Sequence, residues 1–207
     1  LLNNTVSGNS GLGISVAYGM GNQITDNTVG TNTLGGISIT NSTGNLTGNS
    51  VMGNLAFGIS SGTSNNNIVS ENEISDNTSQ GIIINGNANN VSNNSIFNNG
   101  APGVFIASGN NNSILSNSIY DNDSLGIDLA EGTNDSQVYP TLNTFYTWQD
   151  ESALPEIKGG TSIQGTLTGL PEQNYRIQFF ANSTLNNREG RRYLGEVTAT
   201  TDIIGEA

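Results

Sequence analysis

Carboxylates are the side chains in the first part of this sequence that could perform acid-base chemistry. The 207 residues contain no His and no Cys, and Lys158 is the first basic residue. The candidates that share a repeat position are Asp76 with Asp121, and Asp26 with Glu71. Two carboxylates can hydrolyse a glycosidic bond when one protonates the leaving oxygen and the other activates water. Catalysis therefore depends on whether the fold brings a pair together.

The segment DNDSLGID, residues 121–128, is a second chemical candidate. Asp121 and Asp123 superficially resemble calcium ligands. The segment lacks the twelve-residue loop frame with its closing Glu, and Asn122 belongs to a periodic row. We predict no cofactor, with calcium at Asp121 and Asp123 as the alternative.

These acids are embedded in a repeat. A Gly-apolar-x-apolar unit recurs at steps of 22 or 23 residues, and a fixed period of this length indicates a repeat architecture. Its glycines are Gly13, Gly36, Gly58, Gly81, Gly103 and Gly126.

Three rows of Asn follow the same period. Four residues before each glycine stand Asn9, Asn32, Asn54, Asn77, Asn99 and Asn122, and nine before it stand Asn4, Asn27, Asn49, Asn72, Asn94 and Asn117. A third row, nine residues after the glycine, contains Asn22, Asn45, Asn67, Asn90 and Asn112. The gap from this row to the next Asn alternates between 5 and 4, which suggests a 45-residue pair of turns.

Short Val- and Ile-rich segments separate the Asn and Gly residues, and the 3.6-residue period of a helix is absent. We predict an all-β solenoid of about six 22–23-residue turns, each pairing in parallel with its neighbours at roughly 4.8 Å. Stacked Asn side chains would then point inward and hydrogen-bond from turn to turn.

The period stops after Asn134. We predict a parallel β-helix over residues 1–133, a linker or cap over 134–160 in which Trp148 plugs the solenoid end, and a β-sandwich module over 161–207. Alternation at Tyr175, Ile177 and Phe179 favours antiparallel strands. Leu1 lies inside a repeat and the last module lacks an expected strand, so we expect the sequence to be an excerpt of a longer chain.

The pattern N-x-I-x-x-N-x-I-x-x-N-x-x-x-G-I-x-I over about residues 1–130 resembles the right-handed parallel β-helix repeats of surface proteins, nitrous-oxide accessory (NosD-like) proteins and polysaccharide-active enzymes. A leucine-rich repeat would need a Leu-x-x-Leu-x-Leu frame, which is missing. Residues 161–207 resemble the small β-sandwich modules that follow β-helices in prokaryotic surface proteins.

The resemblance also bears on catalysis. Lyases similar to pectate lyase use a basic residue that residues 1–157 lack, and hydrolases similar to polygalacturonase cluster carboxylates on neighbouring turns. Asp76 and Asp121 are two turns apart, or roughly 10 Å, which exceeds the span of an inverting pair.

Charge excludes several partners. Residues 1–157 contain 12 acids and no base, whereas residues 158–207 contain five of each. A surface without cations cannot neutralise phosphates, so we predict no nucleic-acid, anionic-membrane or polyuronate binding by this part. The sequence also shows no membrane-inserting run.

Two outward rows carry apolar side chains that could form a contact stripe for subunit packing or sugar stacking. They are Met52, Phe97 and Tyr120 in one row, and Ile83 and Phe105 in the other. The alternative is that other segments or domains cover them. The predicted partners are therefore a second copy, neighbouring domains, or carbohydrate.

Asn-x-Ser/Thr sequons are frequent in this sequence, so we separate them by expected geometry. Those in ladder rows, Asn45, Asn77, Asn90 and Asn122, should be inaccessible. The remaining glycosylation candidates are Asn41, Asn93, Asn111, Asn134 and Asn182.

We conclude from the sequence that a non-catalytic structural or adhesive element is favoured, at an extracellular or cell-surface location in a prokaryote. The alternative is a fragment of a polysaccharide-binding or polysaccharide-degrading β-helix enzyme.

Overall fold

The fold was obtained as a computed structural model that describes residues 1–150, 158–183 and 189–207. The chain divides into two compact units. The first contains Leu1–Ser136 together with Gln178–Gly195, and the second contains Gln137–Ile177 together with Glu196–Ala207. This division places residues 178–195, predicted as part of the 161–207 module, with the solenoid.

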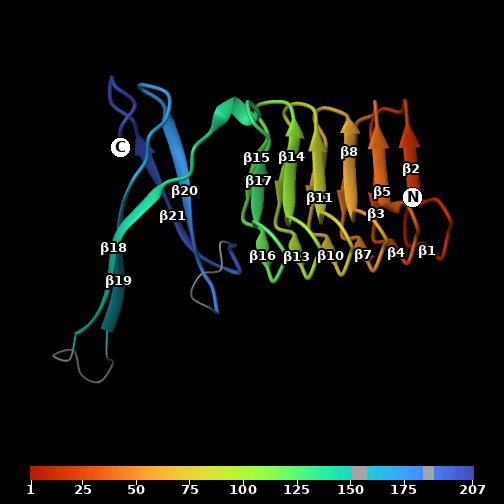
Figure 1. Ribbon diagram of the computed structural model, residues 1–207, viewed down its shortest axis with the longest axis horizontal. Helices are drawn as coiled ribbons and strands as arrows, with labels where there is room; N and C mark the ends of the chain where they lie inside the picture. The colour runs from red at the N-terminus through yellow and green to blue at the C-terminus, as the bar shows by residue number, and fades with distance from the viewer. Residues whose placement is uncertain (151–157, 184–188) are drawn as a thin grey trace. The chain divides into compact units, whose positions relative to one another are not determined.

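The solenoid is built from three parallel sheets; each of the first five coils contributes one strand to every sheet, and the last coil contributes to the first and second sheets (Figure 1). The first sheet contains β1 (Thr5–Ser7), β4 (Thr28–Gly30), β7 (Ser50–Met52), β10 (Glu73–Ser75), β13 (Ser95–Phe97) and β16 (Ser118–Tyr120). The second contains β2 (Leu12–Ala17), β5 (Gly35–Thr40), β8 (Ile59–Thr63), β11 (Ile82–Asn85), β14 (Val104–Ser108) and β17 (Ile127–Leu129). The third contains β3 (Asn22–Thr25), β6 (Gly44–Thr47), β9 (Ile68–Ser70), β12 (Asn90–Ser92) and β15 (Ser113–Leu115).

Equivalent repeat positions pair across the coils. Val6 lies opposite Val29, and Ile74 lies opposite both Val51 and Ile96. In-register pairing stacks each apolar row on itself, because side chains of parallel neighbours at the same position point to the same side. The predicted all-β parallel solenoid is confirmed.

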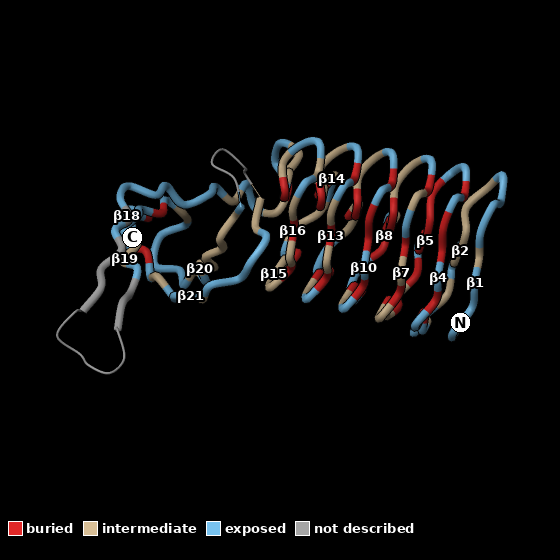
Figure 2. The backbone as a smooth tube through the Cα atoms, turned by 90° about the horizontal axis from the view of Figure 1, so that it is seen from below, coloured by how far each residue is buried: buried red, intermediate tan, exposed pale blue. Residues whose placement is uncertain are grey.

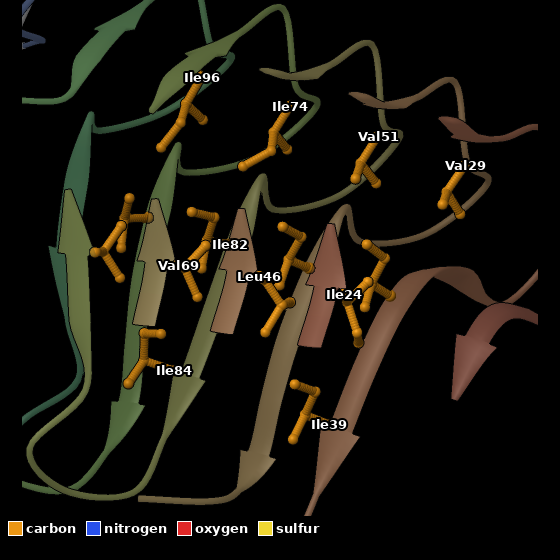
Figure 3. Packing of buried hydrophobic residues seen from close by; sticks show 14 of the residues in the cluster. Ile24, Val29, Ile39, Leu46, Val51, Val69, Ile74, Ile82, Ile84 and Ile96 are labelled. Atoms are coloured by element: carbon orange, nitrogen blue, oxygen red, sulfur yellow. The ribbon is translucent and has the colours of Figure 1, made fainter. Parts of the chain in front are cut away.

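The core is the inner space enclosed by the three sheets (Figures 2 and 3). Its first-sheet row includes Val29, Val51, Ile74 and Ile96, each 0% exposed. Rows from the other two sheets close the core, among them Ile24, Leu46 and Val69 from the third sheet and Ile37, Ile39, Ile59, Ile82, Ile84, Val104 and Ile106 from the second. The core therefore continues from coil to coil, with no break between neighbouring repeats.

Ser61 is the polar residue that interrupts the second-sheet row. It is 3% exposed, and its hydroxyl oxygen accepts a hydrogen bond of 3.0 Å from the backbone N–H of Asn85. The hydroxyl thus satisfies a backbone donor of the next coil, which removes the cost of burying it unpaired.

The repeated glycine is required for steric reasons. A Cβ atom added at Gly58 would lie 2.6 Å from Cγ2 of Ile74 and 2.6 Å from the carbonyl oxygen of Gly81. At Gly36 the same atom would lie 2.4 Å from Cγ1 of Val51. The repeated glycines from Gly13 to Gly103 therefore make room for a core side chain of the following coil.

The first two Asn rows form continuous ladders. The Oδ1 atom of Asn77 accepts both the backbone N–H (3.1 Å) and the Nδ2–H (2.8 Å) of Asn54, and Asn77 makes the same two bonds to Asn99. The Nδ2 of Asn77 also donates to the carbonyl oxygen of Val51 at 3.1 Å. No buried side-chain nitrogen or oxygen in the described residues lacks a partner.

The third ladder differs from its prediction. It runs through Asn67, Asn89, Asn112 and Asn134, and Gly44 donates its backbone N–H to Asn67 at the first step. Asn22 instead donates its Nδ2–H to the carbonyl oxygen of Thr43. Asn45 and Asn90 are not ladder residues; they lie in β6 and β12 beside the buried Leu46 and Val91 and are respectively half-buried and exposed.

The alternation of repeat length therefore lies elsewhere. From Gly44 to Asn112, each third-ladder position is five residues before the next Asn of the second row, with Gly44 before Asn49 and Asn89 before Asn94. The extra residue falls in the corner between the second and third sheets, where the pairing of β11 with β14 shifts register between Ile84 and Asn85. Asn89 rather than Asn90 occupies the ladder because the corner is one residue shorter there.

The remaining elements do not confirm a β-sandwich. A short 3-10 helix, η1 (Asn134–Ser136), follows the last coil. Strand β18 (Thr141–Asp150) pairs with β19 (Lys158–Thr166), and β20 (Asn174–Ala181) pairs with β21 (Arg192–Thr200). Among the described residues of 161–207, Leu167 is the buried apolar side chain, whereas a sandwich core needs inward rows from both sheets. No helix in the described ranges is long and apolar enough to cross a membrane.

Candidate functional site

The candidate acids occupy exposed corners of the coils. Asp26, Glu71, Asp76 and Asp121 have φ between 53° and 58°, the left-handed conformation that Asp and Asn tolerate better than most residues. Asn98 holds the same corner, with φ 54°, in the coil between Asp76 and Asp121. The left-handed corner thus explains Asp26, Asp76 and Asp121, and the fold keeps both candidate pairs two coils apart.

The candidate calcium ligands do not lie in a cluster of metal-ligating side chains. Asp121 and Asp123 are exposed, and no group of three or more potential metal-ligating side chains occurs among the residues that the structure describes. The Oδ2 of Asp121 instead lies 3.8 Å from Nη1 of Arg191.

The predicted contact stripe consists of two separate groups. Met52, Phe97 and Tyr120 lie in the first sheet, whereas Ile83 pairs with Phe105 in the second. Ser75 stands between Met52 and Phe97 in the first-sheet row. These five residues therefore do not form one surface.

The aromatic pair is also unsuited to sugar stacking. The rings of Phe97 and Tyr120 stack with centroids 5.0 Å apart and an interplanar angle of 5°. The guanidinium carbon of Arg191 lies 4.3 Å from the centroid of Tyr120. Protein groups therefore occupy both faces of the Tyr120 ring and one face of the Phe97 ring.

The sequons separate differently from the prediction. Asn41, Asn93 and Asn111 are exposed, whereas Asn134 accepts the backbone N–H of Asn112 as part of the third ladder. The Oδ1 of Asn182 accepts the N–H of Arg191, and its Nδ2 donates to the carbonyl oxygen of Glu189. Geometry alone therefore disfavours Asn134 and Asn182.

The most specific polar arrangement lies at the last coil, where residues 189–191 form what we call the end cap. The carboxylate oxygen Oε1 of Glu189 accepts the backbone N–H (3.1 Å) and the Nδ2–H (2.8 Å) of Asn122. Asn99 makes the same two bonds to Oδ1 of Asn122, at 3.1 and 2.9 Å. Glu189 thus takes the position of the next Asn in the ladder.

Gly190 continues the cap through its backbone. Its N–H donates to the carbonyl oxygen of Ile119 at 2.9 Å, and the N–H of Ile119 donates back at 2.8 Å, forming an antiparallel bridge. A Cβ atom at Gly126 would lie 3.0 Å from Cα of Glu189, and one at Gly190 would lie 2.9 Å from the ring of Phe180. The close approach therefore favours glycine on both sides.

Arg191 completes the cap with a charge. Besides its contacts with Tyr120 and Asp121, its carbonyl oxygen accepts the hydroxyl of Ser118. Gln178 lies on the same coil end, where its Oε1 accepts the N–H of Ser116 at 2.8 Å. These contacts satisfy edge groups that a terminal coil would otherwise leave unpaired.

Sequence reasoning missed the end cap. It expected a cap within residues 134–160 and a plug at Trp148, whose side chain lies outside the described residues. The available signal was the need for an acceptor beyond Asn122, but that requirement does not identify Glu189, which lies 67 positions further on.

Comparison with known proteins gives one match. A family model described as "Right handed beta helix region" matches residues 1–145. No curated protein matches the chain.

Proposed function

Because the chain belongs to the right-handed β-helix family, we propose that it is a non-catalytic structural or adhesive element of an extracellular or cell-surface assembly. The observation that carries this proposal is the continuous pairing of core rows and Asn ladders through all coils. A stack in which each coil supports the next makes a stiff rod, a form suited to stalks, filaments and surface layers.

The placement of the acids supports the same proposal. Asp76 and Asp121 are exposed corner residues on coils that are not adjacent, and Asp121 is paired with Arg191. General acid-base hydrolysis needs two carboxyl groups facing one bond. Of the three groups of proteins that the repeat resembles, the proposal therefore favours a role like that of the surface proteins over that of NosD-like proteins or polysaccharide enzymes.

The expected partners follow from the surface. Because the solenoid half carries acids and no bases before Lys158, its partners are neutral surfaces, carbohydrate, neighbouring domains or a second copy, rather than nucleic acid.

The experiment compares assembly with catalysis. The purified chain is incubated with neutral and acidic polysaccharides, released sugar is measured, and particles are imaged by electron microscopy without added sugar. We expect rods or ordered arrays and no sugar release. Sugar release that Asp76→Asn or Asp121→Asn abolishes would overturn the proposal in favour of a polysaccharide-degrading enzyme.

A further inference from the structure

The last coil contacts the three consecutive residues of the end cap through three different kinds of interaction: side-chain hydrogen bonds, backbone pairing and contacts with a cation. We propose that this coil end is a docking site for an extended Glu-Gly-Arg segment, closed here by the chain's own residues 189–191 and able to accept the same segment of a second copy. The inference goes beyond the proposed function, since a non-catalytic rod would remain a rod if docking from a second copy failed.

The first position of the site selects a carboxylate or amide oxygen. Asn122 directs its backbone N–H and its Nδ2–H at one point, and a single oxygen, Oε1 of Glu189, accepts both. Hydrogen bonds from N–H donors are stronger when the acceptor oxygen carries a charge. The ladder has the same polarity in every coil, so its last Asn always offers donors in this direction.

The second and third positions select glycine and a cation. Gly190 exchanges two backbone hydrogen bonds with Ile119 in the manner of strand addition, and Gly126 leaves room for Cα of Glu189. Tyr120 and Asp121 then offer a ring face and a carboxylate to the guanidinium of Arg191. A cation at this position also complements a solenoid sequence that has no basic residue of its own.

The second copy is favoured as the occupant because of how the chain is divided. Residues 178–195 belong to the solenoid unit, but the residues on both sides of them, Gln137–Ile177 and Glu196–Ala207, belong to the other unit. The end cap is therefore not continuous in sequence with the coil that it closes. An identical segment from another copy can make the same contacts with the last coil, because those contacts do not depend on the chain running directly from the coil into the cap.

The first test opens the site in the full chain. Gly190→Pro removes the N–H that donates to Ile119, and a fluorescent peptide with the sequence of residues 189–193, Glu-Gly-Arg-Arg-Tyr, serves as the probe. We expect saturable binding to the variant by fluorescence polarisation, and binding about tenfold weaker to the wild type, whose site is filled. Replacing the peptide's Glu or its first Arg by Ala should weaken binding by a factor of about 10.

Absence of peptide binding to a variant that keeps the wild-type circular dichroism would overturn the site. If Gly190→Pro fails to fold, the double variant Glu189→Ala/Arg191→Ala, which keeps the glycine backbone, replaces it in the same assay.

The second test addresses the occupant. Wild-type chain refolded at high concentration should contain dimers by light scattering, and excess peptide should dissociate them. The double variant should remain monomeric. Wild-type chain that is monomeric at every concentration would overturn the second copy as occupant.

Discussion

The middle coils and the last coil meet the same requirement with different residues. In the middle, Asn77 accepts hydrogen bonds from two N–H groups of Asn54 and donates two of its own N–H groups to Asn99. At the end, Asn122 donates two hydrogen bonds, from its backbone N–H and its Nδ2–H, to Glu189, which lies outside the repeat. Periodic sequence therefore solves the problem of stacking, whereas ending the stack requires a residue that breaks the period.

The two regions also differ in what surrounds their hydrogen bonds. Asn77 and Asn99 are 1% exposed. Asn122 is half-buried, and Arg191 in the end cap is exposed. Buried hydrogen bonds are costly to leave unmade, and those near water are less so. The comparison predicts effects that decrease from the core of the middle coils to the corners.

The largest effect is expected for Gly58→Ala. The new Cβ would meet Ile74 and the carbonyl oxygen of Gly81 at 2.6 Å, so neighbouring coils must separate. We expect a loss of about 3 kcal/mol in unfolding free energy, measured by denaturant titration. The matched control is Gly11→Ala, because no atom lies within 4 Å of a Cβ at Gly11. Equal stabilities of the two variants would contradict the steric role of the repeated glycine.

A smaller loss is expected for Asn77→Ala. The change removes the acceptor of two Asn54 donors and leaves the backbone N–H of Asn54 buried without that partner. We expect a loss of about 2 kcal/mol by the same titration. Asn90→Ala is the control, since Asn90 is exposed outside the third ladder, and it should change stability by less than about 0.5 kcal/mol. A large loss in Asn90→Ala would restore the original ladder assignment.

How far the sequence predicts this molecule follows from the same contrast. A row such as Val29, Val51 and Ile74 is predictable because each coil imposes the same requirement at the same interval. The repeat period wrongly predicts Asn90 instead of Asn89 for the third ladder, because the corner before this position is one residue shorter in that coil. Charge singles out the corner acids in the sequence, whereas left-handed φ angles explain the positions of Asp26, Asp76 and Asp121.

The end cap could not be found by period. Its contacts with the last coil join residues far apart in the sequence, as in the bond from Asn122 to Glu189 across 67 positions. Each of these residues is used once, so no repeated pattern marks them. The donors of Asn122 require an acceptor, and Tyr120 with Asp121 favours a cation, but several acidic and basic residues after Lys158 could supply either one. Three-dimensional placement alone identified Glu189 and Arg191.

A local effect is expected for Glu189→Ala. Loss of Oε1 leaves two donors of Asn122 without their acceptor at a half-buried site, so we expect about 1 kcal/mol, confined to the last coil. Hydrogen exchange of the Asn122 amide should accelerate, while that of Asn77 stays unchanged. Glu189→Gln keeps an oxygen acceptor and should preserve most of the protection. Uniform acceleration through all coils would show that the cap controls the whole solenoid rather than its end.

The smallest effect is expected for Asp76→Asn, which tests whether the corner acids are there for conformation. Asp76 is exposed with φ 56°, and Asn adopts this left-handed conformation at least as readily, so stability should change by less than about 0.5 kcal/mol. Asp76→Val should lose about 1 to 2 kcal/mol, because a β-branched side chain is strained at positive φ. Thermal unfolding of the two variants measures the difference. If both variants unfolded at the same temperature as the wild type, backbone conformation would not be the reason for an acid at this corner, and its charge would have to be.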